Sequence, residues 1–209
     1  MKYLKLFESF EDIDEICKEY GIENYTINSD GSIDVDEYVD LYGKNLTKLP
    51  IKFNKVNGDF YCSYNKLTTL EGSPIEVNGY FGCHNNQLTT LKGSPKEVNG
   101  DFKCVENQLT SFEFAPKIIR GGFDCENNNI KTFEHFPSYI KYYFWCYHNP
   151  IYEVWRLFED LTKIELLNDF DIFRDEDTDE PAIIMDRLND FLLTIGKDPV
   201  EKVKGYKNI

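Results

Sequence analysis

Apolar residues recur at every twenty-first position along the middle of this chain. Each repeat opens with two apolar positions separated by one variable position, as in Phe102-Lys103-Cys104. Such alternation places both apolar side chains on one face of a short strand. The repeated residues are Phe60, Phe81, Phe102, Phe123 and Phe144, and Cys62, Cys83, Cys104, Cys125 and Cys146. The pattern therefore predicts parallel strands, one in each repeat, that stack with their Phe and Cys side chains inside.

The other positions of the repeat keep the same register and read F-x-C-x-x-N-x-L-x-x-L-x-G-x-P-x-x-V-x-G-x. The Asn can bond neighbouring backbone groups where the chain leaves the strand. The Pro keeps the return segment extended and non-helical. Because a repeat this short leaves no room for a strand, two bends and a full helix, each repeat is expected to pair a strand with an extended return.

A degenerate repeat precedes the clear ones. Its apolar positions are Val35, Val39, Leu41 and Leu46, which fall one repeat length before Val56, Phe60, Cys62 and Leu67. We therefore expect about six short strands, near residues 39–41, 60–62, 81–83, 102–104, 123–125 and 144–146. Stacked in order, they predict a right-handed parallel β solenoid over residues 35–150.

The segment Cys-x-x-Asn-x-Leu-x-x-Leu resembles the strand exit of leucine-rich repeats, with Cys where Leu or Val is usual. The Pro and the following Val resemble the short bacterial subtype, whose convex side is extended, although one extra residue precedes the Phe. This resemblance covers Asn45–Val154. The opening residues 1–7 and the ending residues 203–209 are also similar to uncharacterised leucine-rich-repeat proteins of tailed bacteriophages, a family from which no activity carries over.

A solenoid exposes apolar surface at both ends, so a capping segment is expected on each side. At the N-terminus, residues 1–34 predict a helix over Phe10–Tyr20 with Ser9 as its N-cap, ended by Gly21. A β-hairpin should follow, with strands at residues 25–27 and 32–35 around the turn at 28–31.

The C-terminal cap is expected to be helical and to cover residues 151–209. Apolar residues at helical spacing predict a first helix over Ile151–Leu167. An acidic loop around residues 174–180 should separate it from a second helix, which Pro181 opens and Gly196 closes near Ile195.

The charge balance restricts the class of partner. The chain has 23 Lys and Arg against 37 Asp and Glu, a formal net charge of -14, which repels nucleic-acid phosphates. No apolar run is long enough to span a bilayer, so no membrane association is expected. The chain should be soluble and cytoplasmic, in the host cytoplasm if it is viral.

The cysteines and acidic residues do not predict a cofactor or a metal. The regular spacing lines up the thiols inside the stack, whereas metal ligands must converge on one point. Parallel side chains on adjacent strands also have poor disulfide geometry, so reduced thiols are expected. The calcium-like run Asp30-x-Ser32-x-Asp34 has Val35 where such a loop requires Gly.

No pattern of catalytic residues supports an enzyme. His84 is adjacent to Cys83, but alternation points the two side chains in opposite directions. Asp124 and Glu126 project from the same strand face, where nothing in the sequence supplies a pocket, so both are expected to be solvated.

The outward positions of the strands vary while the inward ones do not, which favours a binding function for the concave strand face. Aromatics gather toward its C-terminal end, and interface centres favour Tyr and Trp. The predicted partner-binding residues are Tyr61, Tyr80, His84, Lys103, Tyr143, Trp145 and Tyr147. Either a partner or the chain's own segment from Ile151 onward could cover the three C-terminal aromatics.

The leading functional hypothesis is a non-catalytic protein-binding module whose partner is another protein. The phage resemblance implies a protein that binds or inhibits a host factor. The alternative is a structural or assembly component of a virion, and the sequence predicts no particular oligomeric state.

Overall fold

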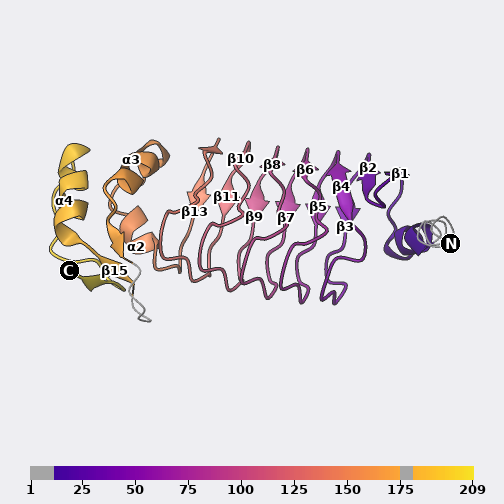
Figure 1. Cartoon of the computed structure of the whole chain (residues 1–209), viewed down its shortest axis with the longest axis horizontal. Helices are drawn as coiled ribbons and strands as arrows, with labels where there is room; N and C mark the ends of the chain where they lie inside the picture. Colours follow the sequence, from indigo (N-terminus) through magenta and orange to yellow (C-terminus); the bar gives the residue numbers. More distant parts are fainter. Residues whose placement is uncertain (1–11, 175–180) are drawn as a thin grey trace.

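The computed structural model describes residues 12–174 and 181–209. This part of the chain is elongated, with a helix at its N-terminal end and three more helices and a small sheet at its C-terminal end (Figure 1). Between these ends two sheets, whose strands are mostly parallel, run along the molecule.

The first sheet, called the Phe sheet below, has six strands in the order β13-β11-β9-β7-β5-β3. Its members are β3 (Val39–Asp40), β5 (Phe60–Tyr61), β7 (Phe81–Gly82), β9 (Phe102–Lys103), β11 (Phe123–Asp124) and β13 (Phe144–Trp145). Neighbouring strands come from consecutive repeats and pair in parallel at equivalent positions, so Phe102 lies opposite both Phe81 and Phe123. The predicted strand positions and their parallel pairing are confirmed.

The return segments form a second sheet, called the return sheet, which raises the number of strands above the expected six. Its order is β1-β2-β4-β6-β8-β10-β12. Its members are β1 (Tyr25–Ile27), β2 (Ile33–Val35), β4 (Phe53–Val56), β6 (Glu76–Val77), β8 (Glu97–Val98), β10 (Ile118–Ile119) and β12 (Tyr139–Ile140). Each repeated Pro precedes its strand by two positions, as Pro74 precedes Glu76. The amide that proline lacks is therefore outside the paired residues, and the returns can pair.

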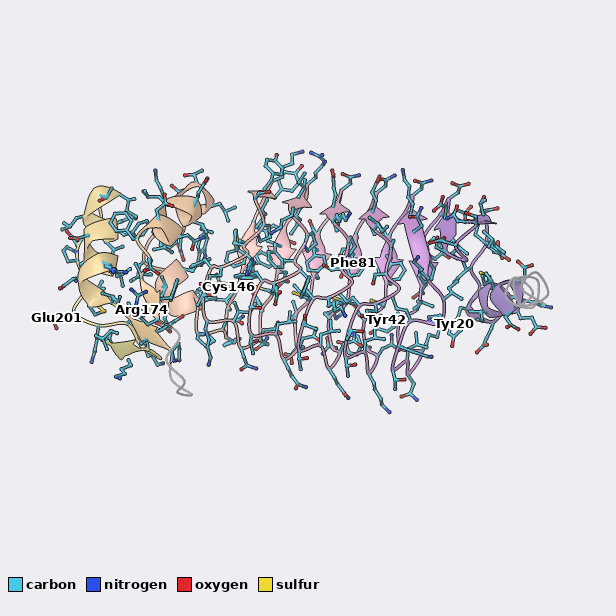
Figure 2. All side chains as sticks on the ribbon, in the orientation of Figure 1. Tyr20, Tyr42, Phe81, Cys146, Arg174 and Glu201 are labelled. Atoms are coloured by element: carbon cyan, nitrogen blue, oxygen red, sulfur yellow. The ribbon has the colours of Figure 1, made fainter. Side chains whose placement is uncertain are left out.

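The hydrophobic core lies between the two sheets. All five repeated Phe side chains and all five repeated Cys side chains are buried. The rings of Phe60 and Phe81 stack at 5.3 Å with 7° between their planes, and Phe81 and Phe102 stack at 5.4 Å. Phe81 is labelled in Figure 2, among the repeats in the middle of the molecule.

A buried asparagine ladder joins each repeat to the one before it. The side-chain Nδ2 of Asn107 donates to the carbonyl oxygens of Cys104 and Cys83, both at 3.1 Å. Its Oδ1 accepts from the backbone nitrogen of Leu88 at 3.0 Å. The same bonds recur at Asn65, Asn86, Asn128 and Asn149. The predicted role of this Asn at the strand exit is confirmed, and it extends across two repeats.

The N-terminal segment contains a helix over residues 12–20 and then the predicted hairpin, β1 (Tyr25–Ile27) with β2 (Ile33–Val35). Gly21 follows the helix with φ +65°, as expected for a helix stop. Because β2 also pairs in parallel with β4, the hairpin begins the return sheet and is continuous with the repeats. The proposed cap residue Ser9 and the helix start at Phe10 lie outside the described residues.

The first C-terminal helix is broken, and the prediction of one helix over Ile151–Leu167 is wrong. The segment forms α2 (Tyr152–Trp155), a 3-10 turn η1 (Leu161–Lys163) and α3 (Ile164–Asp169). Glu159 has φ +48°, which a continuing α-helix does not allow. The Asp160 side chain then accepts from the backbone nitrogen of Thr162 at 2.9 Å and starts the next turn.

The second C-terminal helix begins later than predicted, and Pro181 does not open it. Pro181 instead precedes β15 (Ala182–Ile183), which pairs with β14 (Phe173–Arg174) and β16 (Lys207–Asn208). Helix α4 then covers Met185–Thr194, and Gly196 follows with φ +74°. The acidic residues 175–180 of the predicted loop lie outside the described residues.

Candidate binding face

The outward side chains of the Phe sheet form three rows along the stack, one position before, one after and three after each Phe. All seven predicted binding residues belong to these rows. The structure divides them into an N-terminal group around Tyr61, Tyr80 and His84 and a C-terminal group around Tyr143, Trp145 and Tyr147. Lys103 lies on β9, one of the two strands between the groups.

Tyr143 is half-buried and tied into the fold. Its hydroxyl donates to Asp101 Oδ2 at 2.8 Å, and Asp101 Oδ1 accepts from the backbone nitrogen of Gly122 at 2.7 Å. Desolvation by burial, followed by the hydrogen bond to Asp101, raises the pKa of Tyr143. The ring of Trp145 lies against Tyr143, with 4.2 Å between the centroids. Tyr143 therefore supports Trp145 as well as contributing surface.

Tyr61 and Tyr80 form a similar unit near the N-terminal end of the sheet. Asp59 accepts from the Tyr61 hydroxyl at 2.6 Å and from the backbone nitrogen of Tyr80 at 2.7 Å. The hydrogen bond to Asp59 raises the pKa of Tyr61 to about 12. The two rings lie 5.3 Å apart, and the Tyr80 ring covers Gly82, where a Cβ atom would meet it at 2.5 Å.

Two exposed tyrosines that sequence alternation did not single out extend the N-terminal group. Tyr64 packs against Tyr42 at 5.0 Å and edge-on against His84 at 5.3 Å, and it is 51% exposed. Tyr64 has φ +57° at the strand exit, so it no longer follows the alternation of the strand. Its repeat equivalents, Asn85, Glu106, Asn127 and His148, share the left-handed conformation. In the sequence, each of them directly precedes the repeated Asn, and this position marks the turn.

The C-terminal aromatics are only partly covered by the chain's own cap. Helix α2 covers the core end through Trp155, which packs edge-on against Phe144 at 5.1 Å. Tyr152 of the same helix reaches Tyr147, with 4.8 Å between the ring centroids. Trp145 and Tyr147 nevertheless each remain 43% exposed. The cap thus covers the end of the core and leaves both of these side chains open to solvent.

Asp124 is buried, so the expectation that it is solvated is wrong. It is 6% exposed and lies in register between Lys103 and Trp145 on the neighbouring strands. Desolvation by burial raises the pKa of its carboxyl group, although the Glu126 amide, Lys103 and His84 oppose that shift. Glu126 is half-buried, and burial together with the Asp124 charge also raises its pKa.

The stacked cysteines lie on the other side of the Phe sheet and take no part in this face. All six cysteines are free and buried. Burial raises the pKa of the thiols of Cys83 and Cys104 well above the ordinary value. His84 lies on the outward side with its Nδ1 atom 3.0 Å from Asn85 Oδ1. Within residues 12–174 and 181–209, no group of three or more His, Cys, Asp or Glu side chains is placed to hold a metal ion.

Comparisons of the chain with protein-family models, curated proteins and solved structures find no match. Among the helices of the described segments, none is both long enough and apolar enough to cross a bilayer.

Proposed function

We propose that the chain is a leucine-rich-repeat-like, right-handed solenoid whose exposed Phe-sheet face binds another protein. The repeat motif and the in-register pairing of equivalent strands from consecutive repeats support the solenoid. The asparagine ladder, which bonds each strand exit to the previous repeat, is a further feature expected of stacked repeats.

The observation that carries the binding proposal is the exposed indole of Trp145. It projects from the strand face and rests on Tyr143, whose hydroxyl is fixed by Asp101. A large aromatic that is held rigid before binding loses little conformational entropy when a partner covers it. Exposed aromatics of this kind are enriched at the centres of protein interfaces. Tyr147 and Tyr64 add further exposed aromatic surface to the same sheet.

The similarity of the chain ends to phage leucine-rich-repeat proteins supports a partner inside an infected bacterium. In that setting the protein would bind or inhibit a host factor and would act without catalysis. The alternative function, a structural or assembly component of a virion, makes a different prediction, because such a protein must be present in purified virus particles.

The test compares three tagged proteins in extracts of infected bacteria: wild type, Trp145→Ala and Ile75→Ala. Ile75 is an exposed apolar residue next to the return sheet, so its variant is a matched control. The retained partner is identified by mass spectrometry, purified and titrated. Trp145→Ala should keep the melting temperature and lose about 2 kcal/mol or more of binding free energy, while Ile75→Ala should bind as wild type does.

Two results would contradict the proposal. If Trp145→Ala lowers the melting temperature while its binding is unchanged, Trp145 belongs to the fold and not to an interface. If Ile75→Ala loses the partner and Trp145→Ala does not, the binding surface is the return sheet.

A further inference from the structure

The hydrogen bonding of Asp124 is incomplete for a buried carboxylate. Within the described residues it accepts one hydrogen bond, from the backbone nitrogen of Glu126 at 3.3 Å. An ionised carboxylate has about four acceptor positions, and most of those of Asp124 are left unfilled by the described residues. The other two outward aspartates of the central repeats differ, because Asp59 and Asp101 each accept from a backbone amide and a tyrosine hydroxyl.

No ion pair of the described residues neutralises the negative charge at this place. Asp124 and Glu126 project from the same face, and no ion pair within 4.0 Å involves either carboxylate among the described residues. Lys103 is the neighbour of Asp124 on β9 but forms no such pair. Two carboxylates that are desolvated and close to each other attract a cationic group from outside the chain.

An aromatic ring borders the same place. Trp145 is the register partner of Asp124 on β13, and its exposed indole lies on the same face. A cationic group over an indole gains cation–π attraction, and Trp is the most favourable ring for it. A guanidinium fits both features, because its planar donor groups match a carboxylate while its flat face stacks on an aromatic ring.

We infer that Asp124, Glu126 and Trp145 form a seat for an arginine side chain of the partner protein. This inference rests on the proposed function, since it names the chemistry that the exposed strand face recognises. In the seat, Asp124 accepts hydrogen bonds from the guanidinium and Trp145 packs against its plane. Glu126 adds a second negative charge at the rim, and the partner segment that supplies the arginine should be basic.

The probe is a hexa-arginine peptide, with hexalysine and hexacitrulline as matched peptides of different charge or shape. The chain has two tryptophans, so nuclear magnetic resonance of the indole N–H groups gives two signals. Trp155 is buried within the cap and acts as the internal reference. In about 0.15 M salt, where general attraction is screened, hexa-arginine should shift the Trp145 signal and leave that of Trp155 in place. Hexalysine should bind several-fold more weakly, and hexacitrulline should cause no shift.

Two variants distinguish binding at the Asp124 site from general attraction to the negative charge of the protein. Asp124→Asn should weaken hexa-arginine binding about tenfold, the size expected for a charge-assisted hydrogen bond. Glu113→Gln removes the same charge from an exposed turn outside the Phe sheet and should change affinity less than about twofold. A thermal melt of each variant confirms that it is folded before the titration.

The inference is overturned if hexa-arginine leaves the Trp145 signal unmoved, or if Glu113→Gln weakens binding as much as Asp124→Asn does. It is also overturned if hexalysine and hexa-arginine bind equally, since the seat is then not selective for a guanidinium. The proposed function can survive these results. If the purified partner still loses affinity for Trp145→Ala but not for Asp124→Asn, the face binds a protein by other chemistry.

Discussion

The hydroxyl of Tyr143 donates a hydrogen bond to Asp101 Oδ2 at 2.8 Å, and the two residues are 42 positions apart in the chain. One whole repeat lies between them, and the Tyr143 ring crosses that repeat at Gly122. A Cβ atom built at Gly122 would lie 2.1 Å from the ring. The bond therefore requires that Gly122 have no side chain, and it joins three consecutive strands across the exposed face.

Substitution of this glycine should destabilise the protein. Gly122→Ala forces the Tyr143 ring away from Asp101, with an expected loss of about 1–3 kcal/mol in the free energy of unfolding. Tyr143→Phe removes the hydroxyl alone and should cost about 1 kcal/mol. Urea unfolding measures both. The double variant Gly122→Ala/Tyr143→Ser should lose less than the sum of its single variants, and full additivity would show that the ring does not contact position 122.

The asparagine ladder gives a prediction about an isosteric change. Asn107→Asp keeps the shape of the side chain but removes the two donor bonds to the carbonyl oxygens of Cys83 and Cys104. A buried carboxylate would then face two carbonyl groups, so the free energy of unfolding should fall by about 3 kcal/mol at neutral pH. Urea unfolding provides the measurement. Asn129→Asp, at an exposed position of the next repeat, is the control and should change stability by less than about 0.5 kcal/mol.

The thiols should be unreactive in the folded protein. Cys62, Cys83, Cys104 and Cys125 are fully buried. Burial raises the pKa of each thiol, which lowers the fraction of reactive thiolate. Burial also keeps reagents away from the sulfur atoms. A chromogenic thiol reagent should react slowly in buffer and with all six cysteines in denaturant. The exposed control Lys66→Cys should add one rapidly reacting thiol. Rapid reaction of the unmodified protein, or stoichiometric zinc in the purified sample, would contradict this account.

The Phe sheet could be predicted because a single physical signal repeats in it. Phe102 and Cys104 alternate inward, and the constant spacing of the repeats allows only one parallel register. The return sheet lacked the alternating signal, because each return has one repeated apolar position, such as Val77 or Val98, and closely follows a proline. The pairing of its strands depends on the stacking of neighbouring repeats and not on local propensity.

The same distinction between a repeated local pattern and contacts from other strands applies to the candidate binding face. Alternation gave the outward direction of Tyr143, Trp145 and Asp124 correctly. Burial of Asp124 depends on side chains from the adjacent strands, which no local pattern encodes. The break between α2 and α3 was also missed, because the apolar spacing continues through Glu159 although the backbone there is left-handed.

Removal of the C-terminal cap should expose apolar surface and cause aggregation. A chain that ends at Asn168 keeps Trp155 over Phe144 but loses α4, whose Phe191 packs against Phe158 at 5.4 Å. Phe191→Ala should cost about 3–5 kcal/mol, whereas Leu193→Ala on the exposed side of α4 should be nearly neutral. Light scattering and thermal melts make the comparison. A soluble, cooperatively unfolding truncation would show that α4 has a role other than capping.

The final prediction concerns Asp124→Asn, which should raise the stability of the fold at neutral pH while it weakens the binding of hexa-arginine. Burial raises the pKa of Asp124 in the folded protein above the ordinary value of 3.8. Its charged environment comprises Lys103 and His84, which favour ionisation, and Asp101 and Glu126, which oppose it. The folded state therefore holds a proton more tightly than the unfolded state. The unfolding free energy should fall as pH rises from about the ordinary pKa through the raised one.

Asp124→Asn removes that dependence and can still accept the bond from the Glu126 amide through its side-chain oxygen. The variant should be more stable than wild type at neutral pH, and the difference should shrink as the pH is lowered toward the ordinary carboxyl pKa. Urea unfolding at several pH values measures this. Asp186→Asn, an exposed acid in the first turn of α4, is the control and should show no such gain. If Asp124→Asn is less stable than wild type at neutral pH, the buried carboxylate stabilises the fold. Its burial would then be explained without the cation of a partner.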